Sequence, residues 1–260
     1  MKELESSVIV AAHPDDENLW FSSILSKVDQ VVICFLPVPS NSTWTEGRRK
    51  SLASYPLGNV SCLELVESEV FWGVDWSRAV ETEYGLKITD TRLSDKAYIQ
   101  NFDILQQQLR TQLQGYRNVF THNPWGEYGH VEHVQVYRAV KALQREMKFS
   151  LWFPNYASNK SAGLMADTLA GRELQSVTLE TDKALAERIA DVYKVNDCWT
   201  WYKDYAWCDS ETFIGDCDEP AEGRGYGRVV TINFISIEPQ PVELSRFAKL
   251  VARVRRRARL

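Results

Sequence analysis

The sequence predicts an α/β fold, with a Rossmann-like, mostly parallel sheet and helices on both faces. Three observations support this. Unbroken apolar runs at 8–12 and 31–36, and the apolar residues 151–153, are typical of strands buried on both faces. Stretches such as 97–115 carry apolar residues at helical spacing. The two patterns alternate along the chain, as expected where a helix connects successive parallel strands.

In the first half, proline and glycine mark the ends of elements. Pro37 and Pro39 end the second strand, and Gly115 ends the clearest helix. The expected elements are a strand at 8–12, a helix of about a dozen residues, a strand at 31–36, a polar loop at 40–47, a short helix, strands near 60–66 and 70–73, and a helix at 97–115.

In the second half, the same patterns continue with more irregular stretches between them. We expect a strand at 119–121, a loop at 122–129, a helix at 130–148, a strand at 150–153, a small and polar insertion at 155–175, a strand at 177–179, a helix at 183–195, an aromatic stretch at 198–213, a loop at 215–228, a strand at 229–237 and a helix at 242–260. No repeat or linker interrupts this order, so residues 1–260 are predicted to form one domain with a basic C-terminal helix.

The formal net charge of −5 argues against nucleic acid as a partner. The chain has five cysteines, an odd number, and no two of them form a C-x-x-C motif. This pattern is typical of reduced thiols in the cytoplasm. The first apolar run is too short for a signal peptide. We therefore expect a cytoplasmic protein, while the oligomeric state is not readable from the sequence.

Three consecutive acidic residues follow the first strand, in the segment His13-Pro14-Asp15-Asp16-Glu17. Pro14 keeps His13 extended, at the edge of the sheet where α/β proteins bind ligands. Adjacent carboxylates repel one another unless a positive charge lies among them, and a divalent metal is the simplest such charge. The alternative is that the acids only cap the first turn of the following helix.

A second cluster favours the metal. Three of the chain's four histidines, His122, His130 and His133, lie after the strand at 119–121. His130 and His133 are spaced to share one helix face, and Gly126 and Gly129 let the loop approach closely. A His, Asp and His set with an open position is the composition of a catalytic zinc site.

The segment 13–17, together with Gly129-His130-Val131-Glu132-His133-Val134, resembles the PIG-L/LmbE-like family of zinc-dependent N-deacetylases and related amidases. The resemblance covers about residues 6–150. It implies an LmbE-like fold and hydrolysis of an N-acetyl group from an amino sugar or sugar conjugate.

The resemblance also implies roles for individual residues. His13, Asp16 and His133 match the family's ligands for one Zn²⁺, a set that Fe²⁺ also accepts. Asp15 matches the general base. His130 matches the residue that stabilises the oxyanion or protonates the leaving amine, and we expect it to act as a cation.

Two positions depart from the family pattern. Many members carry a glycine pair in the helix after the first motif, where this chain has Asn18-Leu19-Trp20-Phe21-Ser22. Glu132 stands where an Asp is usual between the two histidines, and we expect it to support a ligand without binding the metal. The pocket floor is therefore expected to differ, while the ligand set is retained.

Further residues are candidates to support the site or to bind substrate. Arg48 lies where many members place a substrate-binding arginine. Trp125 and Tyr128 flank the histidine loop, and we expect them to stack on a sugar ring, although core packing is the alternative for each. His122 is expected to orient a ligand histidine.

Two other functions are weighed against deacetylation. The first is a metal-dependent amidase that acts on a thiol conjugate or another amide. The second is a nucleotide-binding module without hydrolysis, which is disfavoured because no G-x-G-x-x-G follows the first strand.

The predicted helix at 242–260 combines an apolar stripe with many arginines, as interfacial helices do. Packing on the body of the protein, or a soluble basic end, is one interpretation of this pattern. The other, from which a prediction follows, is peripheral contact with anionic lipid at the cytoplasmic face of a membrane. A chain ending at residue 240 should lose binding to anionic liposomes in a co-sedimentation assay. Equal binding by the full and shortened chains would contradict the prediction.

Overall fold

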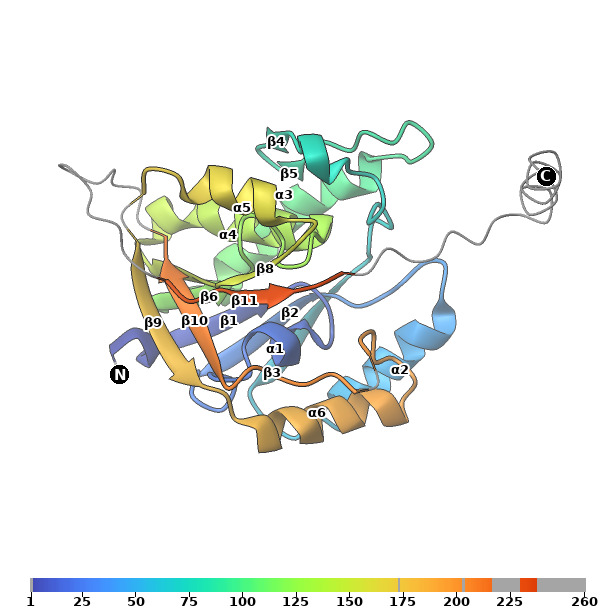
Figure 1. Cartoon of the computed structure of the whole chain (residues 1–260). Coiled ribbons are helices and arrows are strands. Elements are labelled where there is room, and N and C mark those ends of the chain that lie inside the picture. Colours follow the sequence, from blue (N-terminus) through green and yellow to red (C-terminus); the bar gives the residue numbers. More distant parts are fainter. Residues whose placement is uncertain (1, 173, 203, 217–229, 238–260) are drawn as a thin grey trace, which may run out of the picture.

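The computed structural model describes residues 2–172, 174–202, 204–216 and 230–237. This part of the chain contains a seven-stranded sheet in the order β3-β2-β1-β6-β7-β10-β9 (Figure 1). The strands are β1 (Ser7–Ala11), β2 (Gln30–Phe35), β3 (Val60–Leu65), β6 (Asn118–Thr121), β7 (Ser150–Pro154), β9 (Gln175–Glu180) and β10 (Ser210–Gly215). The strands β3, β2, β1, β6 and β7 pair in parallel, and β10 runs antiparallel to both β7 and β9. The predicted mostly parallel α/β fold is confirmed.

Helices cover both faces of this sheet (Figure 1). The helices α3 and α4 lie on one face, and α1 and α6 lie on the other. The helices are α1 (Asp16–Trp20), α2 (Ser42–Ala53), α3 (Lys96–Gln112), α4 (Val131–Met147), α5 (Ala162–Leu169) and α6 (Lys183–Val195). Smaller elements are the 3-10 helices η1 (Lys2–Leu4) and η2 (Trp76–Arg78) and two short pairs, β4 (Glu81–Thr82) with β5 (Gly85–Leu86), and β8 (Tyr156–Ser158) with β11 (Asn233–Ile235).

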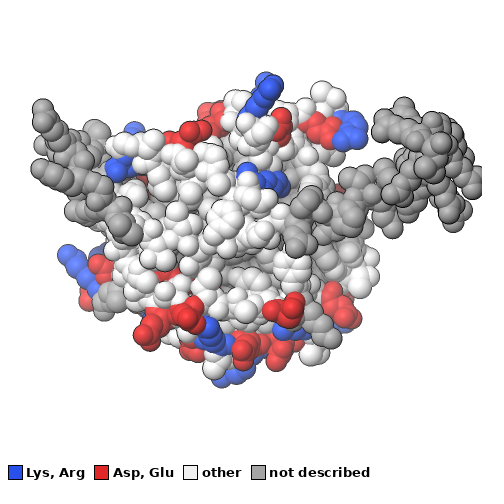
Figure 2. All heavy atoms as spheres, viewed as in Figure 1, with Lys and Arg blue, Asp and Glu red and all other residues white. Residues whose placement is uncertain are grey.

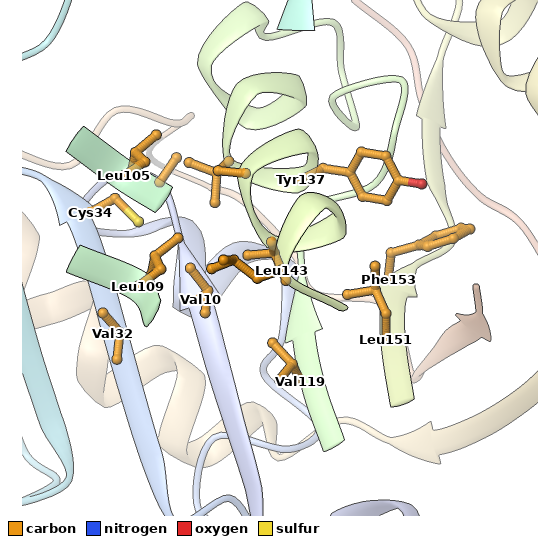
Figure 3. Close-up of a cluster of buried hydrophobic side chains, with 14 of the residues drawn as sticks. Val10, Val32, Cys34, Leu105, Leu109, Val119, Tyr137, Leu143, Leu151 and Phe153 are labelled. Atoms are coloured by element: carbon orange, nitrogen blue, oxygen red, sulfur yellow. The ribbon is translucent and has the colours of Figure 1, made fainter. Parts of the chain in front are cut away.

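The alternation of side chains along β1 divides the core into two layers. Val8 and Val10 point to the α3–α4 face, where Val10 lies in one cluster with Leu109 and Leu143 (Figure 3). Ile9 and Ala11 point to the opposite layer, which α1 and α6 cover. Both layers are buried, which explains why β1 reads as an unbroken apolar run and not as an alternating one.

Some boundaries differ from those that the sequence predicts. The residues 70–73 form a turn closed by the Gly73 N–H on the Val70 carbonyl, so the strand predicted there is wrong. The first helix has only five residues, and α2 begins at Ser42, inside the predicted loop, because Asn41 caps it by accepting from the Trp44 N–H.

The segments 155–175 and 198–213 contain more regular structure than their composition indicates. The predicted insertion at 155–175 holds β8 and α5. The aromatic stretch ends in β10, which no strand prediction covered and which joins β7 to β9. Most of the predicted loop at 215–228, the start of the strand at 229–237 and the whole helix at 242–260 lie outside the described residues.

The helix α6 matches the predicted range 183–195 and is amphipathic. Its residues Leu185, Ile189 and Tyr193 are buried against the sheet. Figure 2 shows charged side chains along the lower edge of the molecule, where α6 lies. The middle of the face seen in this view is mostly uncharged. Among the described helices, none combines the length and apolar character needed to span a membrane.

We predict that Leu109→Ala lowers the free energy of unfolding by about 2–5 kcal/mol, because it leaves a cavity between α3 and the sheet. The matched control is Ile104→Ala on the same helix. Leu109 is 0% exposed and Ile104 is 40% exposed, so the control should cost less than about 1 kcal/mol. Urea unfolding followed by circular dichroism measures both, and equal losses would contradict the packing described.

Candidate metal centre

The candidate site lies where the neighbouring strands β1 and β6 end. The chain leaves β1 for β2 on one side and returns to β6 on the other, so the strand order reverses between them. Ligands bind in the crevice at such a switch point. His13 follows β1 and His122 follows β6. The backbone N–H of Ala12 donates a 2.8 Å hydrogen bond to Nε2 of His122, so the two loops are joined directly.

The first loop turns sharply at Asp15, whose φ of 97° lies in the left-handed region. Non-glycine residues adopt this region at a cost of about 1–3 kcal/mol, which the surrounding contacts must offset. Asp16 is held at both carboxylate oxygens. Its Oδ1 accepts from Nε1 of Trp20 at 3.0 Å, and its Oδ2 accepts from the His13 backbone N–H at 2.8 Å.

The second loop brings the remaining histidines to the same place. Gly126 has a φ of 65°, and a Cβ there would lie 2.4 Å from the carbonyl oxygen of His130, so only glycine fits. His130 is the N-cap of α4, and His133 lies one helical turn further on. The ring centroids of His130 and His133 are 4.4 Å apart, and those of His13 and His130 are 4.7 Å apart.

The arrangement around Oδ2 of Asp16 fits a divalent metal. Nδ1 of His13 lies 3.0 Å from this oxygen and Nε2 of His133 lies 3.1 Å from it. The His133 Nε2 atom is buried and has no hydrogen-bond partner. Ligands about 2.1 Å from a tetrahedral ion lie roughly 3.4 Å from one another, which is close to these separations.

The geometry groups possible ligand atoms in three overlapping sets. They are His13 with His130 and His133, Asp16 with His122 and His133, and His13 with Glu67 and Glu132. The ring nitrogens of His122 contact Ala12 and Glu127, and Nδ1 of His130 accepts from a backbone N–H. The first two sets share His133, whose buried Nε2 has no hydrogen-bond partner.

A buried carboxylate, Glu127, fixes the proton positions on two of these rings. Its Oε2 lies 2.6 Å from Nδ1 of His133 and 3.0 Å from Nδ1 of His122. Both rings therefore carry their proton on Nδ1 and present a lone pair on Nε2. Burial alone would raise the pKa of Glu127, but the two histidines outweigh it and lower the pKa.

His13 contacts carboxylates at both ring nitrogens. Nδ1 faces Asp16, and Nε2 lies 2.9 Å from Oε2 of Glu132, whose other oxygen accepts from the N–H and hydroxyl of Ser68. Burial would lower the pKa of His13, but the charge of Glu67 and contacts with the other two carboxylates raise it to about 10. The site is thus rich in negative charge and suited to a cation.

His130 differs from the expectation that it is a cation. Burial and the neighbouring His133 and His13 lower the pKa of His130 well below its usual range. Its Nδ1 accepts the backbone N–H of Glu132 at 3.2 Å, so the neutral ring carries its proton on Nε2. His130 is therefore a neutral hydrogen-bond donor beside the candidate ligands.

Asp15 is anchored by a residue more than 180 positions away. Its Oδ2 accepts from the backbone N–H of Thr200 at 3.1 Å and from the Thr200 hydroxyl at 2.5 Å. Among the described residues, none donates a hydrogen bond to its Oδ1. Burial and the charge of Asp16 raise the pKa of Asp15 well above its usual range, so this carboxylate accepts a proton readily.

The predicted substrate contacts have different surroundings. Arg48 is buried, donates to the Leu36 carbonyl at 3.1 Å and pairs with Glu67, which lies 3.8 Å from Nε2 of His13. The Nε of Arg48 has no partner. Arg48 is therefore separated from His13 by the carboxylate of Glu67, which contacts both residues.

The two aromatic residues that flank the histidines, Trp125 and Tyr128, differ in burial and in their contacts. Trp125 is fully buried, packs on Phe153 and donates from its indole N–H to the carbonyl of Tyr156 at 2.6 Å, so it serves the core and not a sugar platform. Tyr128 is partly exposed, and its ring centroid lies 5.1 Å from that of Trp201. Tyr128 is the one placed to contact a ligand.

The fold and the two loops define a doubly wound α/β protein with a candidate metal centre at the switch point of its sheet. The sequence model described as PIG-L, GlcNAc-PI de-N-acetylase, matches residues 8–144, which include both loops. The chain therefore belongs to the PIG-L family. Comparison with curated proteins gives no match.

Three of the solved structures that resemble the chain are described as structures of deacetylases. A deacetylase–teicoplanin complex is 12% identical with a TM-score of 0.49, covering 80% of this chain and 97% of its own. The zinc-inhibited form of teicoplanin deacetylase Orf2 is 12% identical with a TM-score of 0.48, covering 82% and 100%. The A40926 pseudoaglycone deacetylase Dbv21 is 12% identical with a TM-score of 0.47, covering 80% and 96%.

We predict that Glu127→Gln weakens zinc binding by about 10- to 100-fold, because the new NH₂ group would face either the Asn123 N–H or the two Nδ1–H groups, all of which need an acceptor. Zinc affinity is measured by competition with a chromogenic chelator. The control is Glu187→Gln, the same change at an exposed position of α6. Unchanged zinc affinity in a folded Glu127→Gln protein would contradict the assigned network.

Proposed function

We propose that the chain hydrolyses the N-acetyl group of an amino sugar or sugar conjugate, using one divalent metal held by His13, Asp16 and His133. The observation that carries this proposal is the position of Asp16 Oδ2 between Nδ1 of His13 and Nε2 of His133. Membership of a family described as GlcNAc-PI de-N-acetylase supports the choice of bond.

The donor set of two imidazoles and one carboxylate fits zinc, and ferrous iron accepts the same ligands. When bound, such an ion lowers the pKa of a water molecule and polarises an amide carbonyl. Protein residues would then have three tasks: to remove a proton from water, to stabilise the developing oxyanion and to return a proton to the amine.

Asp15 would act as the general base. Thr200 holds Oδ2 by two hydrogen bonds, which orients the carboxylate and leaves Oδ1 to accept the proton. The raised pKa of Asp15, caused by burial and by Asp16, increases its basicity. The same carboxyl group is then a source of the proton that the leaving amine requires.

His130 would stabilise the oxyanion as a neutral donor through its Nε2–H. Its Nδ1 is occupied by the N–H of Glu132, which fixes both the tautomer and the ring plane. A donor fixed before the reaction stabilises developing charge without reorganising. Placement of the sugar would fall to Tyr128, while Arg48, whose Nε is buried, would act through Glu67, which lies beside His13.

The proposal also covers the substrate and the location of the protein. The substrate would be a small molecule or glycan that bears an N-acetyl group. The protein would act in the cytoplasm and contact a membrane surface through residues 242–260.

We predict that Asp15→Asn lowers kcat by about 10²- to 10⁴-fold while leaving the metal content unchanged, since it removes a base and not a ligand. Asp16→Asn is the matched variant, with the same chemical change one position further on, and it should lose both metal and activity. Free-amine detection and metal analysis by mass spectrometry give the two measurements.

The assay uses a panel of N-acetylhexosamine glycans and amide conjugates, each with and without chelator. Release of amine from the glycans, abolished by chelator and restored by zinc, is the expected result. Release only from thiol or other amide conjugates would replace deacetylation with the amidase. Full activity in Asp15→Asn would rule out the assigned base.

A further inference from the structure

A row of five aromatic side chains crosses the candidate site, and we call it the aromatic ridge. In spatial order its members are Trp72, Phe71, Tyr128, Trp201 and Tyr202. Successive ring centroids are 4.5, 6.2, 5.1 and 5.9 Å apart. The ridge is assembled from three segments that are far apart in the sequence, so no repeat or helical period produces it.

The middle of the ridge contacts His130, the proposed oxyanion donor. The Phe71 ring centroid lies 4.6 Å from that of His130, and the Tyr128 centroid lies 5.8 Å from it. The two ends are open to solvent, since Trp72 is 75% exposed and Tyr202 is 53% exposed. Single exposed aromatic residues are common, but these two end a continuous row that begins at the reaction centre.

Both arms of the ridge are anchored to the loops that carry the proposed chemistry. On one side, Thr200 is hydrogen-bonded to Asp15 and directly precedes Trp201. On the other, Nζ of Lys160 donates to the Gly129 carbonyl at 2.8 Å and lies 4.6 Å from the ring centroid of Phe71. The spacing between the arms and the site is therefore set before any ligand arrives.

Aromatic rings bind flat groups that have an apolar face, and hexose rings present such faces of C–H groups. One sugar ring is about the size of one ridge side chain. A lone N-acetylhexosamine at the centre would cover only the middle of the ridge and leave both ends in water. Trp72 on one side and Trp201 with Tyr202 on the other offer contacts to further rings on either side of the reacting sugar.

We propose that the aromatic ridge is a two-sided substrate platform, which selects an N-acetylated sugar that carries another ring-shaped group on each side over the free monosaccharide. The inference rests on the proposed function and deepens it by naming the substrate class. The flanking rings are recognised by their apolar faces. Both hexose residues and aryl aglycones have such an apolar face. The experiment below distinguishes between these two kinds of flanking ring.

The test compares N-acetylglucosamine, its p-nitrophenyl glycoside and N,N′,N″-triacetylchitotriose on Trp72→Ala and Tyr202→Ala. For each variant we expect KM for the trisaccharide to rise about three- to tenfold, with kcat within twofold and the monosaccharide unaffected. Trp72→Phe and Tyr202→Phe should restore most of the affinity. Phe234→Ala, which removes a 60% exposed ring from β11, is the control.

Equilibrium dialysis of the trisaccharide with the metal-free protein separates this inference from the proposed function. Weaker trisaccharide binding by both alanine variants supports the platform even if no amine is released from any substrate. Unchanged binding and KM in both variants would overturn the platform even if deacetylation is observed. If KM in the alanine variants rises for the aryl glycoside but not for the trisaccharide, the platform binds aryl aglycones. That result would overturn the proposal that it binds neighbouring sugar rings.

Discussion

One carboxylate oxygen, Oε2 of Glu127, receives hydrogen bonds from two imidazole rings, and the arrangement of the site depends on it. Through His122 it is connected to the backbone of Ala12, and therefore to the loop after β1. Through His133 it determines which nitrogen faces Asp16. Because Glu127 is fully buried, removing either partner would leave polar groups unpaired where water cannot replace them.

The topology explains why two segments more than a hundred positions apart meet at this point. β1 and β6 are neighbours that pair in parallel, although β2, β3 and α3 lie between them in the sequence. Parallel strands end at the same edge, so the loops that follow both strands face one crevice. Apolar layers above and below hold the strands, which leaves the loop residues free to be polar.

Much of the fold could be predicted from the sequence, and so could the two loops that carry the candidate ligands, because both depend on local patterns. Unbroken apolar runs marked β1 and β2, and the helix predicted at 183–195 matches α6. Thr200 could not be found, since no period relates it to Asp15. Glu127 lies within the histidine loop, but its role depends on a positive φ that the sequence does not reveal. The hydrogen bond of Trp20 to Asp16 was signalled only by their spacing of four residues.

The central claim is that His13, Asp16 and His133 share one metal ion. Anomalous diffraction at the zinc edge, from crystals of the zinc-loaded protein, tests it most directly. The account predicts a single peak within about 2.0–2.2 Å of Nδ1 of His13, Oδ2 of Asp16 and Nε2 of His133, with Glu127 unchanged behind the last ring. A peak bound by His122 or Glu132, or no peak between the two loops, would contradict it.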